Sequence, residues 1–170
     1  MKKFALTLLF LALLLGSALT YALVNTSLKL EVLAPNFSPA KSMHEQFERW
    51  AKSHSAKAVQ GTVYDEAPIL DAEDYYFHVY SVRLKNTGLL PVKMCEMQIS
   101  PKKGDVLSYS GKVSLGQSDN KSTDIAPGGS ALLQQVLLTQ SPGGEAREIT
   151  VSYYIWGHPF FVKETIKPGY

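Results

Sequence analysis

The sequence predicts a mainly β protein: an antiparallel β-sandwich of seven or eight strands with one short amphipathic helix, preceded by an N-terminal hydrophobic helix. Residues 4–24 contain no charge and are mostly Leu, Ala and Phe. From residue 58 onward, short stretches rich in β-branched and aromatic residues alternate with Gly, Pro, Asn and Asp, a pattern typical of strands separated by turns. A length of 170 residues, 45% of them hydrophobic, suits a single core.

The hydrophobic helix is predicted over residues 4–24, directly after Lys2 and Lys3. At about 1.5 Å per residue this stretch reaches about 30 Å, the thickness of the hydrocarbon core of a bilayer. Positive flanks stay in the cytoplasm, so we expect a single-pass cell-membrane protein whose C-terminal domain lies outside. The residues that represent the membrane segment are Phe4, Leu8, Leu11, Leu15 and Val24.

A cleaved signal peptide is the alternative interpretation of the same segment. Thr20-Tyr21-Ala22 offers small residues where a signal peptidase cuts, and cleavage following Ala22 would give a secreted protein. Against cleavage, the apolar stretch continues through Leu23 and Val24. The predicted organisation is therefore a signal anchor or signal peptide over residues 1–24 and an extracytoplasmic sandwich domain over residues 27–170.

The first part of the domain is predicted to contain one strand and one helix. Apolar residues alternate from Leu28 to Val32, which is typical of a half-buried strand. Residues 43–55 place apolar side chains at helical spacing, and Ser42 followed by Glu45 matches a capping box. We expect this amphipathic helix to cover one edge or end of the sheets.

The rest of the domain is predicted to consist of strands. Residues 130–138 are the ambiguous segment, because they also suit a helix, but Pro-Gly-Gly on both sides favours a strand. The predicted strands are residues 58–64, 75–85, 92–99, 106–109, 112–115, 130–138, 148–156 and 160–166.

Three segments of the sequence carry a resemblance to a known family: Tyr80–Gly88, Ile125–Ser130 and Ile149–Tyr154. Together they resemble the immunoglobulin-like or fibronectin-III-like β-sandwich domains of bacterial extracytoplasmic proteins, including the cell-adhesion-related type. In that family an Asn-x-Gly turn closes one central strand, and a Pro-Gly turn introduces a later strand opposite it. The resemblance covers about residues 75–166 and implies an immunoglobulin-like sandwich that binds, spaces or presents.

Composition argues against nucleic-acid binding and against disulfides. The net charge of +2 comes from Lys2 and Lys3, since the remaining chain carries 15 basic and 15 acidic residues with no basic cluster. Cys95 is the single cysteine, and we expect it to be a small buried hydrophobic residue.

Three patterns that suggest catalysis or metal binding have simpler explanations. Ser38-Pro39-Ala40-Lys41 and Ser118-Asp119-Asn120 match two elements of penicillin-recognising enzymes, but the third, Lys-Thr-Gly, is missing. His44 begins a metalloprotease-like motif in which Glu48 replaces the second histidine. The acidic residues between 65 and 74 lack the glycine of a calcium loop. We therefore expect no catalytic residue, metal site or cofactor.

The aromatic segment 153–161 is the candidate binding feature. Alternation places part of it in the core, and the Gly-His-Pro turn could present Trp156, His158 and Phe160 as a contact patch. The expected function is a non-catalytic binding or interaction module of the cell envelope, with the bilayer and an unknown protein or glycan as partners. The alternatives are a structural subunit of a surface complex and a small envelope hydrolase.

Overall fold

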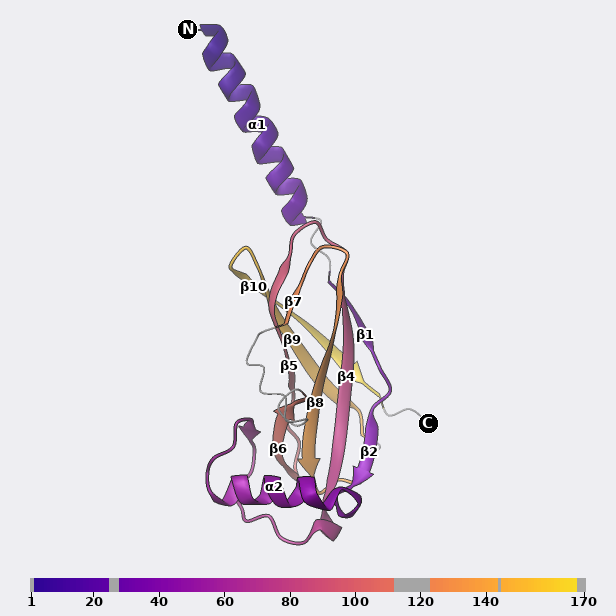
Figure 1. The fold of residues 1–170 in the computed structure, drawn as a ribbon. Coiled ribbons are helices and arrows are strands. Elements are labelled where there is room, and N and C mark those ends of the chain that lie inside the picture. The colour runs from indigo at the N-terminus through magenta and orange to yellow at the C-terminus, as the bar shows by residue number, and fades with distance from the viewer. Residues whose placement is uncertain (1, 25–27, 112–122, 144, 168–170) are drawn as a thin grey trace.

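A computed structural model describes residues 2–24, 28–111, 123–143 and 145–167. Helix α1 (Lys2–Val24) stands away from the rest of the protein (Figure 1), and the side chains of residues 3–21 are exposed. Its 23 residues extend about 34 Å at 1.5 Å per residue, and residues 3–21 have a mean hydropathy of 2.1. The helix is therefore long and apolar enough to cross a bilayer, properties that a signal sequence shares.

The described strands form two antiparallel sheets, which confirms the predicted mainly β sandwich. One sheet contains β1 (Leu28–Val32), β2 (Asn36–Pro39), β3 (Thr62–Val63), β4 (Tyr76–Asn86), β6 (Asp105–Ser110) and β8 (Ser130–Thr139). Its order is β1-β4-β8-β6-β3, and β2 also pairs with β4. The other sheet has the order β10-β9-β5-β7, with β5 (Val92–Ile99), β7 (Thr123–Ile125), β9 (Arg147–Ile155) and β10 (His158–Ile166).

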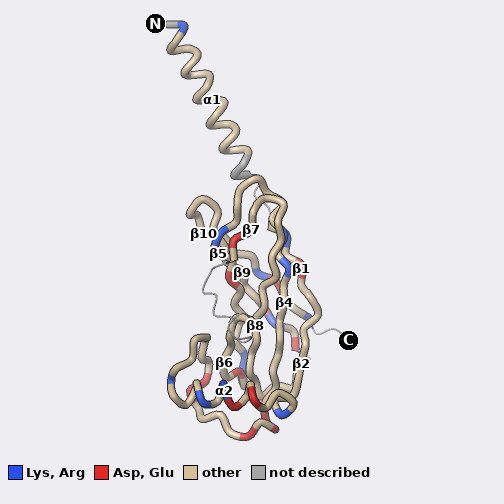
Figure 2. The backbone as a smooth tube through the Cα atoms, in the orientation of Figure 1, with Lys and Arg blue, Asp and Glu red and all other residues tan. Residues whose placement is uncertain are grey.

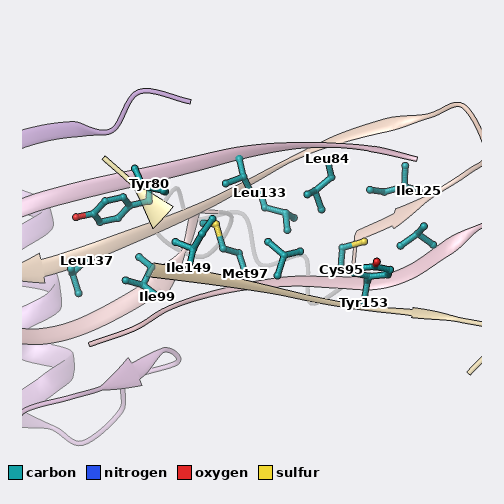
Figure 3. Close-up of a cluster of buried hydrophobic side chains, with 14 of the residues drawn as sticks. Tyr80, Leu84, Cys95, Met97, Ile99, Ile125, Leu133, Leu137, Ile149 and Tyr153 are labelled. Atoms are coloured by element: carbon teal, nitrogen blue, oxygen red, sulfur yellow. The ribbon is translucent and has the colours of Figure 1, made fainter. Parts of the chain in front are cut away.

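The main core lies between the two sheets (Figure 3). Alternate residues of β4, such as Tyr80, Val82 and Leu84, face Ile149 and Val151 of β9. Each of these side chains is at least 99% buried. At about 25 cal/mol per Å² of apolar surface, this burial is the largest stabilising contribution in the domain.

A second core lies on the outer face of the six-stranded sheet. Helix α2 (His44–Ser55), preceded by a 3-10 turn (Ala40–Met43), crosses one end of the sandwich (Figure 1). Trp50 packs edge-on against Phe77 with ring centroids 5.0 Å apart, and contacts Tyr109 at 4.6 Å. The cluster contains no residue of the four-stranded sheet, so α2 covers an end of the six-stranded sheet, as predicted.

Several boundaries differ from the sequence predictions. The capping box is wrong: the helix N-cap is Met43 without a side-chain cap, and the Ser42 hydroxyl instead donates to the Pro39 carbonyl at 2.7 Å. The predicted strand 58–64 is reduced to β3, and strands β2 and β7 were not predicted. The ambiguous segment 130–138 is a strand, β8, which pairs along ten residues with β4. The predicted strand 112–115 lies outside the described residues.

The two ends of the sandwich differ. The end next to helix α1 is called the α1 end, and the end that helix α2 crosses is called the α2 end (Figure 1). Three turns lie at the α1 end: residues 87–91, 126–129 and 156–157 (Figure 1). Asn86 joins the first two, because its amide nitrogen donates to the carbonyls of Leu90 (2.8 Å) and Ile125 (3.1 Å). The Gly128 N–H also donates to the Asn86 carbonyl at 2.9 Å. The Asn-x-Gly and Pro-Gly turns noted in the sequence are thus in direct contact.

Candidate interaction surface

The aromatic segment forms a tight hairpin between β9 and β10. Trp156 (φ +52°) and Gly157 (φ +77°) are the two turn residues, and Ile155 pairs with His158 on either side of them. Positive φ at both central positions is the geometry of a type I′ turn, which matches the twist of the flanking strands. A left-handed conformation costs a residue with a Cβ about 1–2 kcal/mol. Trp156 therefore occupies a position that local conformational preference does not favour.

The hairpin leaves four aromatic side chains partly in solvent. Trp156 is 56% exposed, Phe161 71%, Phe160 38% and Tyr154 37%. These four residues, which lie at the turn and on both faces of the two strands, are called the hairpin patch below. Large apolar groups that gather on a surface are typical of contact sites.

The sequence-predicted site residues occupy different positions on this hairpin. Trp156, His158 and Phe160 are all exposed, and Phe160, at 38%, also stacks on Tyr153 with ring centroids 5.7 Å apart. Phe161, the most exposed aromatic side chain of the hairpin, was not among the predicted site residues. Because the turn has only two residues, Phe160 pairs with the buried Tyr153, and Phe161 pairs with Ser152 on the outer face. Counting alternation outward from a two-residue turn would have identified Phe161.

Two further apolar side chains lie at the same end of the sandwich. Leu89, in the turn after β4, is 58% exposed, and Met94, at an irregularity in β5, is 55% exposed. Lys93, next to Met94, pairs with Tyr154 across β5 and β9. The register therefore places the start of β5 beside the base of the hairpin.

The titratable groups in the interior are sealed from solvent. Arg147 of β9 and Asp105 of β6 form a buried ion pair between the two sheets, and their side chains are 1% and 0% exposed. Burial alone would lower the pKa of Arg147, but the hydrogen bonds that Arg147 donates to Asp105 and the negative charge of Asp105 raise it. His78, on the same interior side, is 1% exposed, and its Nδ1 lies 3.3 Å from the Tyr80 hydroxyl. Burial and the nearby Arg147 charge lower the pKa of His78 to about 4.

Where the structure describes them, the residues of the other candidate patterns lie apart on the surface. Lys41 forms an exposed ion pair with Glu73 at 2.6 Å, and His44 lies 3.9 Å from Glu48 on the surface of α2. Residues 118–120 lie outside the described part of the chain. Within the part that the structure describes, no group of three or more His, Cys, Asp or Glu side chains is arranged to hold a metal ion. Cys95 is buried as predicted, and burial raises the pKa of its thiol to about 11.

Comparison with known proteins gives a fold likeness only. No family model matches the chain, and no curated protein matches it. A solved structure of a Bordetella pertussis protein described as ApaA is 17% identical, with a TM-score of 0.44, over 84% of this chain and 94% of that one. The GAE domain of yeast GGA1 is 10% identical (TM-score 0.39, 64% and 88% coverage). A FixG-related protein from Vibrio parahaemolyticus is 7% identical (TM-score 0.36, 85% and 96%).

These similarities are too low to carry an argument about function. What the structure itself defines is a class: a two-sheet, mainly β sandwich with an apolar N-terminal helix and an exposed aromatic hairpin.

Proposed function

We propose that the protein is a single-pass, membrane-anchored interaction module whose sandwich lies outside the cytoplasmic membrane. The exposed hairpin patch on an otherwise well-packed domain is the observation that carries the proposal. An immunoglobulin-like sandwich of the bacterial extracytoplasmic type fits this function, since such domains bind or present. The partner we propose is a protein, a glycan or the lipid surface rather than nucleic acid, because the longest basic run in the sequence after Lys3 is Lys102-Lys103.

A non-catalytic role is supported by where the polar groups lie. An enzyme needs a titratable group or a metal in an accessible pocket. Among the described residues, the groups with large pKa shifts are His78 and Cys95, whose side chains are 1% and 5% exposed. Substrate has no access to them in the folded protein. The hairpin patch, in contrast, is accessible and apolar.

Membrane fractionation and intact-mass measurement test the anchored form. We expect the full-length mass in the membrane fraction, and we expect it to resist extraction with alkaline carbonate, because α1 then remains in the bilayer. A product that begins at Leu23 and is found in the soluble fraction would contradict anchoring and support a cleaved signal peptide.

A structural subunit of a surface complex is the second candidate function. Strand β10 supports it, because β10 has nine residues and forms an edge of the four-stranded sheet in the described chain. An open edge is a template for pairing with a strand of another chain. Size measurement in mild detergent tests this candidate: a subunit would form assemblies that Thr165→Pro disrupts. Thr165 is exposed and stands in a non-hydrogen-bonded pair with Glu148, so its N–H faces the open edge, and proline there cannot donate to a new ladder.

A further inference from the structure

The geometry points to the lipid headgroup region of the bilayer that α1 spans as the partner of the hairpin patch. This inference rests on the proposed membrane anchoring and names the partner of that same surface.

The connection keeps the α1 end of the sandwich close to the membrane. Helix α1 ends at Val24 and β1 begins at Leu28, so the chain between them spans at most about 14 Å. Leu28 pairs with Asn86, the last residue of β4, directly before the turn that carries Leu89. When α1 crosses the bilayer, this end of the sandwich is held beside the headgroups.

The side chains at that end suit a membrane interface. Trp and Tyr are enriched where hydrocarbon meets headgroups, because an apolar ring and a polar N–H or O–H are both satisfied there. Trp156 and Tyr154 are such residues, and Phe161 and Leu89 add exposed apolar surface. Helices with such residues on one face bury that face about 5–10 Å into the interface, and the same physical chemistry applies to a hairpin tip.

Two neighbouring lysines place positive charge at the α1 end. Lys29 and Lys85 are direct cross-strand neighbours in β1 and β4, and both are exposed. Like charges placed opposite each other destabilise a sheet. Neither lysine has an ion-pair partner among the described residues, whereas the next pair along the ladder, Glu31 and Arg83, bonds at 3.0 Å. Anionic phospholipid headgroups would compensate this unpaired positive charge.

The α2 end has the opposite character. Trp50, the only other tryptophan, is 6% exposed there and belongs to the second core. Acidic side chains gather in the segment between β3 and β4 (Figure 2), namely Asp65, Glu66, Asp71, Glu73 and Asp74. Lysines and an arginine also lie at this end, but residues 40–75 carry seven acidic and four basic side chains, a net charge of −3. Anionic lipid would therefore repel this end, so the charge distribution favours one orientation of the domain on the membrane.

Fluorescence quenching by brominated lipid tests the inference. The full chain is reconstituted in vesicles of phosphatidylcholine and phosphatidylglycerol, with or without bromine on the acyl chains. The wild-type spectrum minus that of Trp156→Phe isolates the emission of Trp156. We expect bromine to reduce this emission by about twofold or more, as for a side chain in the interface. The remaining emission, from Trp50, is the internal control and should not change.

The outcomes separate this inference from the proposed function. If the chain does not float with the vesicles, anchoring fails and the inference fails with it. If the chain floats but bromolipid leaves Trp156 unquenched, only the lipid contact is overturned. Shielding of Trp156 from aqueous iodide without bromolipid quenching would also overturn it, in favour of a protein or a second copy. Wild-type protein alone gives a second measurement, because bromolipid should remove the longer-wavelength emission of the exposed tryptophan first.

Discussion

Arg147 of β9 and Asp105 of β6 join the two sheets through a bidentate ion pair inside the sandwich. The guanidinium Nη2 donates to Oδ1 at 2.7 Å, and Nη1 donates to Oδ2. The Asp105 carboxylate also accepts the Lys102 N–H at 2.7 Å. Each partner thus satisfies a charge that would otherwise be buried alone.

Removal of one member of this pair should strongly destabilise the fold. We expect Arg147→Met to lower the free energy of unfolding by about 3–5 kcal/mol, because Asp105 remains buried without its partner. The double variant Arg147→Met/Asp105→Leu should recover part of this loss. Arg83→Met is the matched control: its pair with Glu31 is exposed, so the change should be below about 1 kcal/mol. Equal effects of Arg147→Met and Arg83→Met, measured by thermal unfolding in mild detergent, would contradict the assignment.

His78 should make the domain less stable in acid. Its pKa of about 4 in the folded protein lies below the ordinary 6.5, so between these values the unfolded chain binds a proton that the folded chain does not. The unfolded state therefore gains stability as the pH falls from about 6.5 toward 4. The loss for this group reaches at most about 3 kcal/mol.

The pH effect is measured as a difference between variants. Near-UV circular dichroism melts at several pH values should show a steeper acid loss for wild type than for His78→Leu. His44→Gln, which removes an exposed histidine, should behave like wild type. The same acid dependence in wild type and His78→Leu would show that carboxylates alone cause it.

Asn86→Ala should loosen the α1 end. The side chain is buried and makes three hydrogen bonds, to the carbonyls of Leu90 and Ile125 and from the Gly88 N–H. At about 1 kcal/mol for each bond, we expect a loss of about 3 kcal/mol. Hydrogen exchange should show faster opening of the residues around this turn first. Asn36→Ala, at an exposed position, serves as the control, and an equal loss there would argue against the role of Asn86.

Substitutions in the hairpin patch should leave the fold intact. Trp156→Ala and Phe161→Ala each remove an exposed ring, so we expect changes within about 0.5 kcal/mol. Trp50→Ala removes a buried ring from the second core and should cost about 3–5 kcal/mol. If Trp156→Ala unfolds the domain in a thermal melt, Trp156 is a core residue and the patch is not a contact surface.

Strong local patterns predicted most of the strands. Tyr76–Asn86 and Val92–Ile99 match their predicted ranges within a residue, because alternation and flanking turn residues mark them clearly. Strand β2 (Asn36–Pro39) was missed because Asn and Pro do not favour strands, and its pairing with β4 is a tertiary interaction. The capping box failed for a similar reason. Strand β2 runs into a 3-10 turn, so Ser42 lies inside that turn and bonds backward to Pro39.

The candidate surface was predicted only in part. Composition identified the aromatic segment, but which rings are exposed depends on the turn length and on how far the opposite sheet extends. The paired lysines, Lys29 and Lys85, are 56 positions apart in sequence and become neighbours only through the register of β1 and β4. The buried pair of Asp105 and Arg147 is likewise a product of the tertiary fold.

Cysteine labelling in intact cells tests the central claim, a domain anchored outside the membrane, most directly. Cys95 should not be labelled by maleimide, because it is buried and its thiol pKa is raised to about 11. Glu66→Cys places a thiol on the exposed α2 end, and Lys3→Cys places one before the apolar helix. A membrane-impermeant maleimide should label full-length Glu66→Cys in intact cells, and Lys3→Cys only after lysis. Labelling of Glu66→Cys only after lysis would place the sandwich in the cytoplasm and contradict the claim.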